Sequence, residues 1–411
     1  MRKTLKKNIR SQYLLQIAKY IVPFVTLPYL TRVLGADAYS VRVYVLSIMT
    51  ILQSVIDFGF TNYGTLLIAK ARLMQENPSK YFSCIINSKV IIIVLSSVVL
   101  VLLILLIPTL SENELFVFFS FLGIVVNALL PDFVFQGFEK MSAITKRYVL
   151  AKIISTLLIF ILVHNPSDLL LIPLCDMAGN LVGVVWALWH ISKEFEIKYQ
   201  RKCWKGLIIH LKKSFQYFSI SFCSTMLNSL SIAVVGILNV SSVGLSVWSL
   251  SLTLINAAQS MYTPIINSLY PDSLMHKDYS IVRSLSLKAL PFVLLVITLL
   301  IILSPMVVEI LAGPEYMAGS YLLSATSPLI LFSFYKALYG WPVLGASGHV
   351  KELGFATYLA AFITVILLVF GVLLQFCNLE YVIAVRIISE ASSCIFVLGC
   401  YFYFRRSLNI D

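Results

Sequence analysis

The basic stretch MRKTLKKNIR (residues 1–10) is followed at once by the apolar run SQYLLQIAKYIVPFVTLPYLTRVL (11–34). An α-helix needs about 20 mostly apolar residues to cross a bilayer, and this run is long enough. Short segments rich in Lys and Arg are retained on the cytoplasmic side of a membrane. We therefore expect residues 11–34 to be a membrane-spanning helix that begins in the cytoplasm. A cleaved signal peptide is excluded, because many further apolar runs follow.

Along the rest of the chain, connections that contain Lys or Arg alternate with connections that contain neither. The connections that contain Lys or Arg are AKARLMQENPSK (69–80), GFEKMSAITKR (137–147), SKEFEIKYQRKCWKG (192–206), HKDYSIVR (276–283), GHVKE (348–352) and the tail FRRSLNID (404–411). The connections between them, which contain neither residue, are PTLSENE (108–114), HNPSD (164–168), GILNVSSVG (236–244), LAGPEY (311–316) and QFCNLEY (375–381). This pattern predicts a multi-pass membrane protein with both termini in the cytoplasm.

The composition agrees with this prediction. Of the 411 residues, 59% are hydrophobic and 12% are charged, whereas about 25% of the residues of a soluble protein are charged. The net charge of +12 comes largely from the basic connections, so we expect it to attract anionic lipid headgroups and not nucleic acid. The seven cysteines have no metal-binding spacing, and no HExxH, GxSxG or phosphate-binding glycine loop occurs. We expect a carrier without catalytic residues, metal or cofactor.

The apolar runs predict an all-α fold with about twelve transmembrane helices, arranged as two six-helix bundles. The predicted spans are 11–34, 40–62, 83–107, 115–137, 145–163, 167–190, 211–236, 240–267, 286–311, 317–340, 353–375 and 380–404. The longest polar connection suggests an N-terminal lobe (1–195), a cytoplasmic linker (196–210) and a C-terminal lobe (211–411). Six spans in each half give both halves one orientation, and such a parallel pseudo-repeat leaves a central cavity between the bundles.

Polar residues recur at helical spacing in the first two spans of each half. In the seventh span they are Tyr217, Ser221, Ser224, Asn228 and Ser231, and in the eighth Ser249, Thr253, Asn256, Ser260, Thr263 and Asn267. A continuous polar face is unfavourable against lipid and either lines water or packs on another helix. Small hydroxyl residues also serve close helix packing, but four such faces in equivalent helices favour a cavity.

Several cations fall within or beside the spans. Lys19 lies well inside the first helix, where an unpaired charge is costly, so we expect it to face the cavity. Arg32 and Arg42 flank the first outer turn and are exceptions to the Lys/Arg-free outer face. Lys152 and Lys336 lie near the inner ends of their helices, where we expect their side chains to extend to the membrane interface.

Four carboxylates are also predicted to lie within spans: Asp57, Asp132, Asp176 and Glu390. Asp176, in CDMAGN, lies near the middle of its span, and Glu390 follows Arg386 at i,i+4 spacing, where the two charges can neutralise each other. Because burial makes a carboxyl group exchange protons more readily near neutral pH, all four are hypotheses for ion coupling.

Four segments carry a family resemblance. They are IVPFVTLPYLTRVLGADAYSVRVYVLSIMTILQSVIDFGFTNYGTLLIAK (21–70), with its Pro-Tyr-Leu, its Leu-Gly turn and its Asp-Phe-Gly-Phe, then PDFVFQGFEKM (131–141), FSISFCSTM (218–226) and GASGHVKE (345–352). Together they resemble the O-antigen flippases, the polysaccharide transporters of the multidrug/oligosaccharidyl-lipid/polysaccharide (MOP) exporter superfamily. Ser40 and Val41 stand where that family usually has a glycine.

The resemblance implies a cargo and a direction of transport. The cargo would be an oligosaccharide repeat unit of O-antigen or a related surface polysaccharide, linked through pyrophosphate to undecaprenyl. It would move by alternating access from the cytoplasmic to the periplasmic leaflet of the bacterial inner membrane, coupled to H⁺ or Na⁺. A polymerase and a chain-length regulator of the same pathway are implied partners.

Site residues follow from the same resemblance. We expect Lys19, Arg32 and Arg42 to attract the diphosphate or an acidic sugar. Asn228, Asn256 and Gln259 would bind sugar hydroxyls, and Tyr217 would stack on a sugar ring.

Two other functions are open on this sequence. A multidrug or small-solute antiporter of the same superfamily would favour cationic cargo and an acidic cavity, whereas this chain places Lys and Arg at the predicted site. An O-antigen polymerase or ligase would resemble its family in having a long periplasmic loop, and every outer connection here is short.

Overall fold

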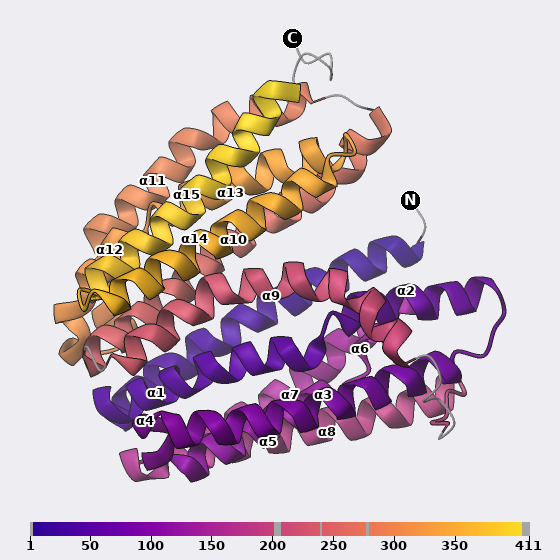
Figure 1. Ribbon diagram of the computed structural model, residues 1–411, viewed down its shortest axis with the longest axis horizontal. Coiled ribbons are helices and arrows are strands. Elements are labelled where there is room, and N and C mark those ends of the chain that lie inside the picture. The colour runs from indigo at the N-terminus through magenta and orange to yellow at the C-terminus, as the bar shows by residue number, and fades with distance from the viewer. Residues whose placement is uncertain (1–2, 201–206, 239–240, 277–278, 405–411) are drawn as a thin grey trace. The chain divides into compact units, whose positions relative to one another are not determined.

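The computed structural model describes residues 3–200, 207–238, 241–276 and 279–404, and every regular element in these ranges is helical. The chain forms two compact units, Met1–Thr225 and Met226–Asp411. The division falls inside the long helix α9 (Leu207–Ile237) (Figure 1). The linker expected at 196–210 remains a prediction, and residues 201–206 of it lie outside the described ranges.

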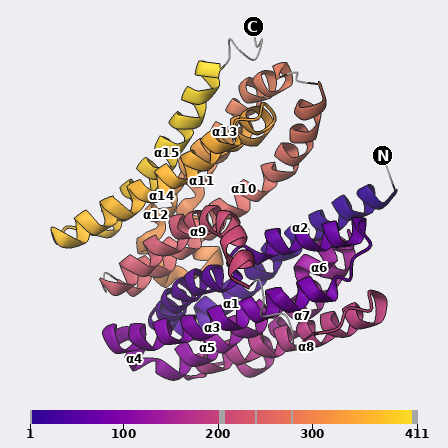
Figure 2. The same ribbon diagram turned by 45° about the vertical axis from the view of Figure 1, so that its right-hand side comes forward.

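The N-terminal unit is built from long helices interrupted by short ones. Its elements before α9 are α1 (Lys3–Asp57), α2 (Phe60–Leu73), α3 (Ser79–Leu106), α4 (Pro108–Glu112), α5 (Glu114–Ala128), α6 (Asp132–Gly137), α7 (Met141–Leu162), the 3₁₀-helix η1 (Pro166–Leu170) and α8 (Leu171–Glu194). Within this unit α8 packs along both α7 and α5, and α1 packs against α7 (Figure 2).

The first predicted span and most of the second lie in the single element α1, which is kinked at Gly35. Gly35 has φ 69° and ψ 177°, a backbone conformation that is essentially restricted to glycine. The kink therefore provides the turn that the Leu-Gly pair predicts. Pro131 similarly interrupts the predicted fourth span, because a proline has no N–H to continue the helix: α5 ends at Ala128 and α6 begins at Asp132.

The Asp-Phe-Gly-Phe segment makes the second kink of the N-terminal unit, between α1 and α2. Gly59 has φ 71°, and a Cβ atom at this position would lie 2.6 Å from the backbone nitrogen of Phe218 in α9. The hydroxyl of Ser214 donates a hydrogen bond to the carbonyl of Phe58 at 2.6 Å, and the rings of Phe58 and Phe218 stack at 4.6 Å. A glycine is required here both by the positive φ and by the close approach of α9.

The C-terminal unit contains the remainder of α9 and a second set of helices. They are α10 (Ser242–His276), α11 (Ser280–Leu311), the 3₁₀-helix η2 (Pro314–Gly319), α12 (Ser320–Thr326), α13 (Leu329–Tyr339), the π-helical turn η3 (Gly340–Gly345), α14 (Val350–Leu373) and α15 (Leu379–Phe404). In this unit α15 packs against both α14 and α13. The predicted tenth span, 317–340, is thus a series of short helices in place of one long one.

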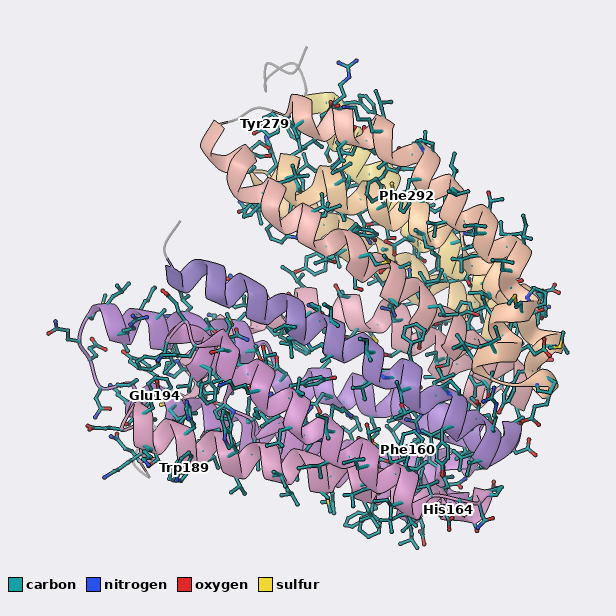
Figure 3. All side chains as sticks on the ribbon, turned by 180° about the vertical axis from the view of Figure 1, so that it is seen from behind. Phe160, His164, Trp189, Glu194, Tyr279 and Phe292 are labelled. Atoms are coloured by element: carbon teal, nitrogen blue, oxygen red, sulfur yellow. The ribbon has the colours of Figure 1, made fainter. Side chains whose placement is uncertain are left out.

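Each of the twelve predicted spans lies largely on helix in the described residues, and several of them, the second, fourth and tenth among them, are divided between successive helical elements. Within the described residues, nine helices are long and apolar enough to cross a membrane, and the longest of them, Leu14–Leu73, includes two predicted spans. Large apolar side chains on the outer surface fit a lipid environment. Phe292, which is 65% exposed, and Trp189 are examples (Figure 3).

The basic connections of the N-terminal unit meet at one end of it. Arg72 lies 3.8 Å from Glu139, and Lys140 lies 2.7 Å from Glu194, so connections 69–80 and 137–147 and the end of α8 are neighbours. His164, in a connection without Lys or Arg, lies at the opposite end of the unit from Glu194 (Figure 3). The predicted alternation of the connections between two ends therefore holds in this unit.

Candidate functional site

Three clusters of charged side chains lie among the helices. The first, which we call the α6 cluster, contains Asp57, Lys89, Asp132 and Arg147. The guanidinium of Arg147 donates a hydrogen bond to the Asp132 carboxylate at 2.9 Å, and the Arg147 side chain is only 4% exposed. The ammonium of Lys89, which is also buried, donates to the carbonyl of Ala128 at 2.9 Å and lies 3.8 Å from Asp57.

Lys19 belongs to the same electrostatic environment. It lies on α1 with an exposed side chain, and its charge interacts with those of Asp132 and Arg147. Counting Lys19, the α6 cluster has three cations and two carboxylates. Asp57 is further held by a hydrogen bond that the Thr61 hydroxyl donates to its carboxylate at 2.7 Å.

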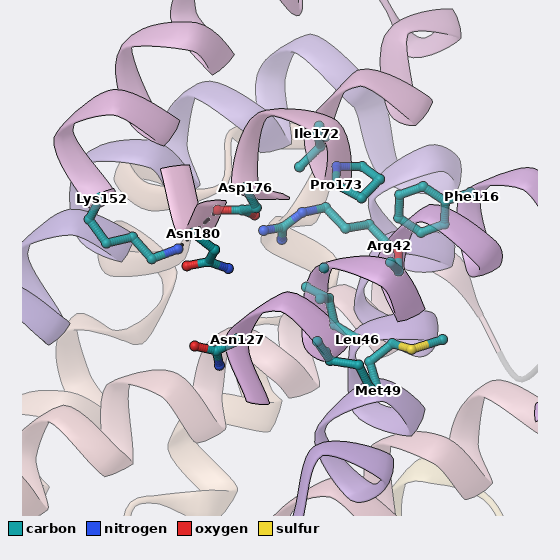
Figure 4. A pocket seen from close by; sticks show the side chains of 13 residues that line it. Arg42, Leu46, Met49, Phe116, Asn127, Lys152, Ile172, Pro173, Asp176 and Asn180 are labelled. Carbon is teal, nitrogen blue, oxygen red and sulfur yellow. Dashed lines mark hydrogen bonds and ion pairs between the residues drawn. The ribbon is translucent and has the colours of Figure 1, made fainter. Parts of the chain in front are cut away.

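The second cluster lines a pocket inside the N-terminal unit, which we call the α5–α8 pocket. The Asp176 carboxylate accepts hydrogen bonds from the Lys152 ammonium at 2.9 Å and from the Ser155 hydroxyl at 2.6 Å. Arg42 extends into the same pocket from α1 (Figure 4). The cavity has a volume of about 240 Å³.

The third cluster, which we call the Glu390 triad, lies in the C-terminal unit. The Glu390 carboxylate is 3% exposed and is in contact with the Lys336 ammonium from α13. Arg386, one helical turn before it on α15, donates to the same carboxylate at 2.8 Å and to the amide oxygen of Asn228 at 3.2 Å. The sequence prediction that Arg386 and Glu390 neutralise each other is confirmed, and Lys336 adds a second cation.

With Lys19 counted in the α6 cluster, each cluster contains one cation more than it has carboxylates. Burying a charge in an apolar interior is costly unless an opposite charge and hydrogen bonds compensate it. Each of the four carboxylates expected to couple ions, Asp57, Asp132, Asp176 and Glu390, has a cation of this chain within 4.0 Å. The helices of both units therefore present an interior with a positive balance of charge, which favours anionic groups.

The remaining predicted site residues lie outside these clusters. Arg32 is exposed on α1, and Asn256 and Gln259 are half-buried on α10. Tyr217 is 37% exposed on α9, and its ring lies 6.4 Å from that of Tyr63. The hydroxyl of Tyr63 shares a hydrogen bond with Nδ1 of His210 at 3.0 Å.

Two predictions about cations were wrong, and two buried cations were missed. Lys152 and Lys336 do not extend to the membrane interface, because each contacts a carboxylate on a neighbouring helix. Arg147, which belongs both to the basic connection 137–147 and to the predicted span 145–163, was given no role; α7 begins at Met141 and carries Arg147 into the interior. Lys89 lies in a polar stretch, Asn87-Ser88-Lys89, at the start of an apolar run, and this was the available signal.

Comparison with known proteins places this arrangement in a family. The family model described as "Polysaccharide biosynthesis protein" matches residues 5–276, which is more than half of the chain. The chain belongs to this family. It is 25% identical over 356 residues to a protein of Escherichia coli (strain K12) described as "Putative O-antigen transporter", with 85% of each chain covered. A protein of Shigella dysenteriae with the same description is 24% identical over 327 residues, which cover 78% of this chain and 81% of the relative.

Solved structures of other proteins have the same fold as this chain. A lipid II flippase, MurJ, in an inward closed conformation matches with a TM-score of 0.68 and 16% identity, covering 95% of this chain and 87% of that chain. An inward-facing multidrug resistance MATE family transporter of the MOP superfamily matches with a TM-score of 0.65 and 12% identity over 94% of both chains. The predicted resemblance and the all-α fold of MOP exporter type are confirmed, as is the expectation of a transporter family in place of an enzyme.

Proposed function

We propose that this protein is a flippase for lipid-linked oligosaccharides. It would move undecaprenyl-pyrophosphate-linked repeat units of O-antigen, or of a related surface polysaccharide, from the cytoplasmic to the periplasmic leaflet of the bacterial inner membrane. The observation that carries the proposal is the similarity to O-antigen transporters along 85% of each chain. The positive balance of charge in the three clusters, with Lys19 counted in the α6 cluster, supports it.

The physical reason for such a protein is the charge of the cargo. A pyrophosphate group and a chain of sugars cannot enter hydrocarbon without replacements for water, because unpaired polar and charged groups are costly there. Cations offset the charge of the diphosphate, and hydroxyl and amide groups replace the water around the sugars. A net positive interior is suited to an anionic cargo and less suited to the cationic cargo expected of a multidrug antiporter.

Individual residues receive roles within this proposal. Lys19 and Arg32, whose side chains are exposed on α1, would attract the diphosphate. Asn256 and Gln259 would bind sugar hydroxyls, with Tyr217 as the stacking surface. The amide oxygen of Asn228 accepts a hydrogen bond from Arg386, so its NH₂ group would be the part that binds sugar.

Alternating access, coupling to H⁺ or Na⁺ and cooperation with a polymerase and a chain-length regulator belong to the same proposal. So does the placement of both termini in the cytoplasm. Single cysteines, introduced into a variant without the seven native ones, test that placement with a membrane-impermeant thiol reagent on intact cells. A cysteine at Gln75, in a basic connection, would stay unlabelled, and one at Ser167, in a connection without Lys or Arg, would be labelled. The reverse pattern would contradict the proposed orientation.

Deletion and complementation in the native strain test the function. Loss of the protein would remove the surface polysaccharide and leave lipid-linked single repeat units on the cytoplasmic side. Single units capped on the outer surface would indicate a polymerase instead. Unchanged polysaccharide with increased sensitivity to drugs would indicate a multidrug antiporter.

Lys19 provides the residue-level test of the same proposal. Lys19→Ala would abolish complementation at a normal protein level, because it removes the charge expected to meet the diphosphate. Lys19→Arg would retain part of the activity, and Lys146→Ala, at an exposed cation of α7, is the matched control. Full activity of Lys19→Ala would remove this assignment.

A further inference from the structure

The α5–α8 pocket has the features of a binding site of its own. Four helices of the N-terminal unit, α1, α5, α7 and α8, line it (Figure 4). Its apolar wall includes Leu46, Met49 and Phe116. Its polar lining is Arg42, Ser120, Asn127, Lys152, Asp176 and Asn180.

The charges in the pocket do not cancel. Asp176 is its one carboxylate, and both Lys152 and Ser155 donate hydrogen bonds to the same oxygen atom, Oδ1. Arg42 adds a second cation, whose charge interacts with those of Asp176 and Lys152. Within the described ranges Arg42 has no hydrogen bond or ion pair, so the pocket retains one uncompensated positive charge.

Two donors in this pocket also lack partners. The Nε atom of Arg42 and the hydroxyl of Ser120 are buried and make no hydrogen bond among the residues that the structure describes. Ser120 is only 7% exposed. A buried donor without a partner costs about 1–3 kcal/mol, and more when it is charged, so native sites of this kind usually hold a ligand or water.

We propose that the α5–α8 pocket binds a small carboxylate that carries hydroxyl groups. A guanidinium presents a planar fork of N–H donors that matches a carboxylate, and the Ser120 hydroxyl supplies a further donor. The amides of Asn127 and Asn180 both donate and accept hydrogen bonds, as adjacent hydroxyl groups require. A cavity of about 240 Å³ is smaller than the 300–1,000 Å³ typical of sites for drug-sized ligands, and it limits the ligand to about one sugar acid or a smaller acid.

The same arrangement disfavours a metal cation as the occupant. The Asp176 carboxylate already has the Lys152 ammonium at 2.9 Å. A sodium ion at this carboxylate would face two resident positive charges. Binding of an anion instead brings the charge of the pocket to zero.

A hydroxylated carboxylate can reach this pocket from two sources, which an experiment can distinguish. One is a free hydroxy acid from solution, for which glycerate is the probe. The other is the carboxylate of an acidic sugar in a repeat unit, for which glucuronate is the probe. The site does not depend on the proposed transport, because binding is measured on the purified full-length protein without any cargo lipid.

Isothermal titration calorimetry in detergent tests the proposal at constant ionic strength, with a bulky sulfonate as the background anion. We expect saturable binding of glycerate, glucuronate or both, and none of glucose. Glycerate alone would identify a free acid, and glucuronate alone an acidic sugar. The proposal would be overturned if neither acid bound, or if chloride bound equally well.

Variants connect this binding to the pocket. Arg42→Gln would weaken it by at least about tenfold, since a hydrogen bond to a charged group contributes about 1.5–3 kcal/mol. Ser120→Ala is the second variant, expected to weaken binding severalfold with little effect on folding. Lys146→Gln, at an exposed cation of α7 that does not line the pocket, is the control with unchanged affinity. Wild-type affinity in Ser120→Ala and Arg42→Gln would place the acid elsewhere and overturn the assignment.

Discussion

The Glu390 triad makes the stability of the C-terminal unit depend on one carboxylate. Glu390 faces two cations, Lys336 and Arg386, from two different helices. Substitution of Glu390 by Gln keeps the shape of the side chain and removes only the negative charge. Both cations then remain among packed helices without a counter-charge, and they also repel each other.

The size of the effect follows from the exposure of the partners. Breaking a buried ion pair by removing one partner costs about 3–5 kcal/mol. Arg386 is 6% exposed and Lys336 is 26% exposed, so Lys336 can regain part of its hydration by moving outward. We therefore expect a loss near the lower value, about 3 kcal/mol. In a unit of this size 1 kcal/mol corresponds to about 2–4 °C, so the melting temperature would fall by roughly 6–12 °C.

The assay is thermal unfolding of the purified protein in detergent, followed by tryptophan fluorescence at a fixed heating rate. Glu380→Gln, at an exposed carboxylate in the first turn of the same helix, is the control and would lower the melting temperature much less, because it removes only a helix-terminus interaction of about 0.3–1 kcal/mol. The double variant Glu390→Gln/Lys336→Met would recover part of the loss, because one stranded cation is removed together with the carboxylate. A melting temperature of Glu390→Gln within 2 °C of the wild type would refute this reasoning, because two buried cations without a counter-charge should cost more free energy than such a small shift indicates.

Two further predictions concern the N-terminal unit. Gly59→Ala would lower stability by about 1–3 kcal/mol for the positive φ alone, and by more because its Cβ atom would meet the backbone of α9 at 2.6 Å. Gly354→Ala, with open space around it, is the control and would show no loss. Equal melting temperatures of the two variants would contradict the requirement for glycine at position 59. In the α6 cluster, Asp132→Asn and Arg147→Gln would each destabilise, and a double-mutant cycle measured by thermal unfolding would give a coupling of about 0.5–3 kcal/mol. Strict additivity of the two losses would mean that the 2.9 Å contact between these side chains contributes nothing.

Hydropathy and length predicted the helices well, because these properties are local and additive. Each helix in the structure begins or ends within a few residues of a predicted span wherever no proline or glycine interrupts it. The alternation of charge also predicted which connections share an end of the N-terminal unit. Gly35 was expected as a turn, whereas the break at Pro131 inside a predicted span was not.

Side-chain partners could not be predicted in the same way. Lys152 and Asp176 are 24 residues apart on adjacent helices, and their contact depends on how each helix is rotated about its axis. Lys336 and Glu390 pose the same problem across a longer separation. A sequence indicates that a charge lies within a span, but the packing of the helices decides whether it turns to the interface or to a partner.

The interruption at Pro131 has a consequence for the charges beside it. In an unbroken helix the carbonyl of Ala128 would accept a hydrogen bond from the backbone of residue 132; here it accepts one from the Lys89 ammonium. The same break exposes the first backbone N–H groups of α6 next to Asp132, where a negative charge is favoured. The interruption at this proline thus lets the backbone itself solvate ions of both signs between packed helices, and an unbroken helix would leave the Lys89 ammonium with Asp57 as its remaining partner.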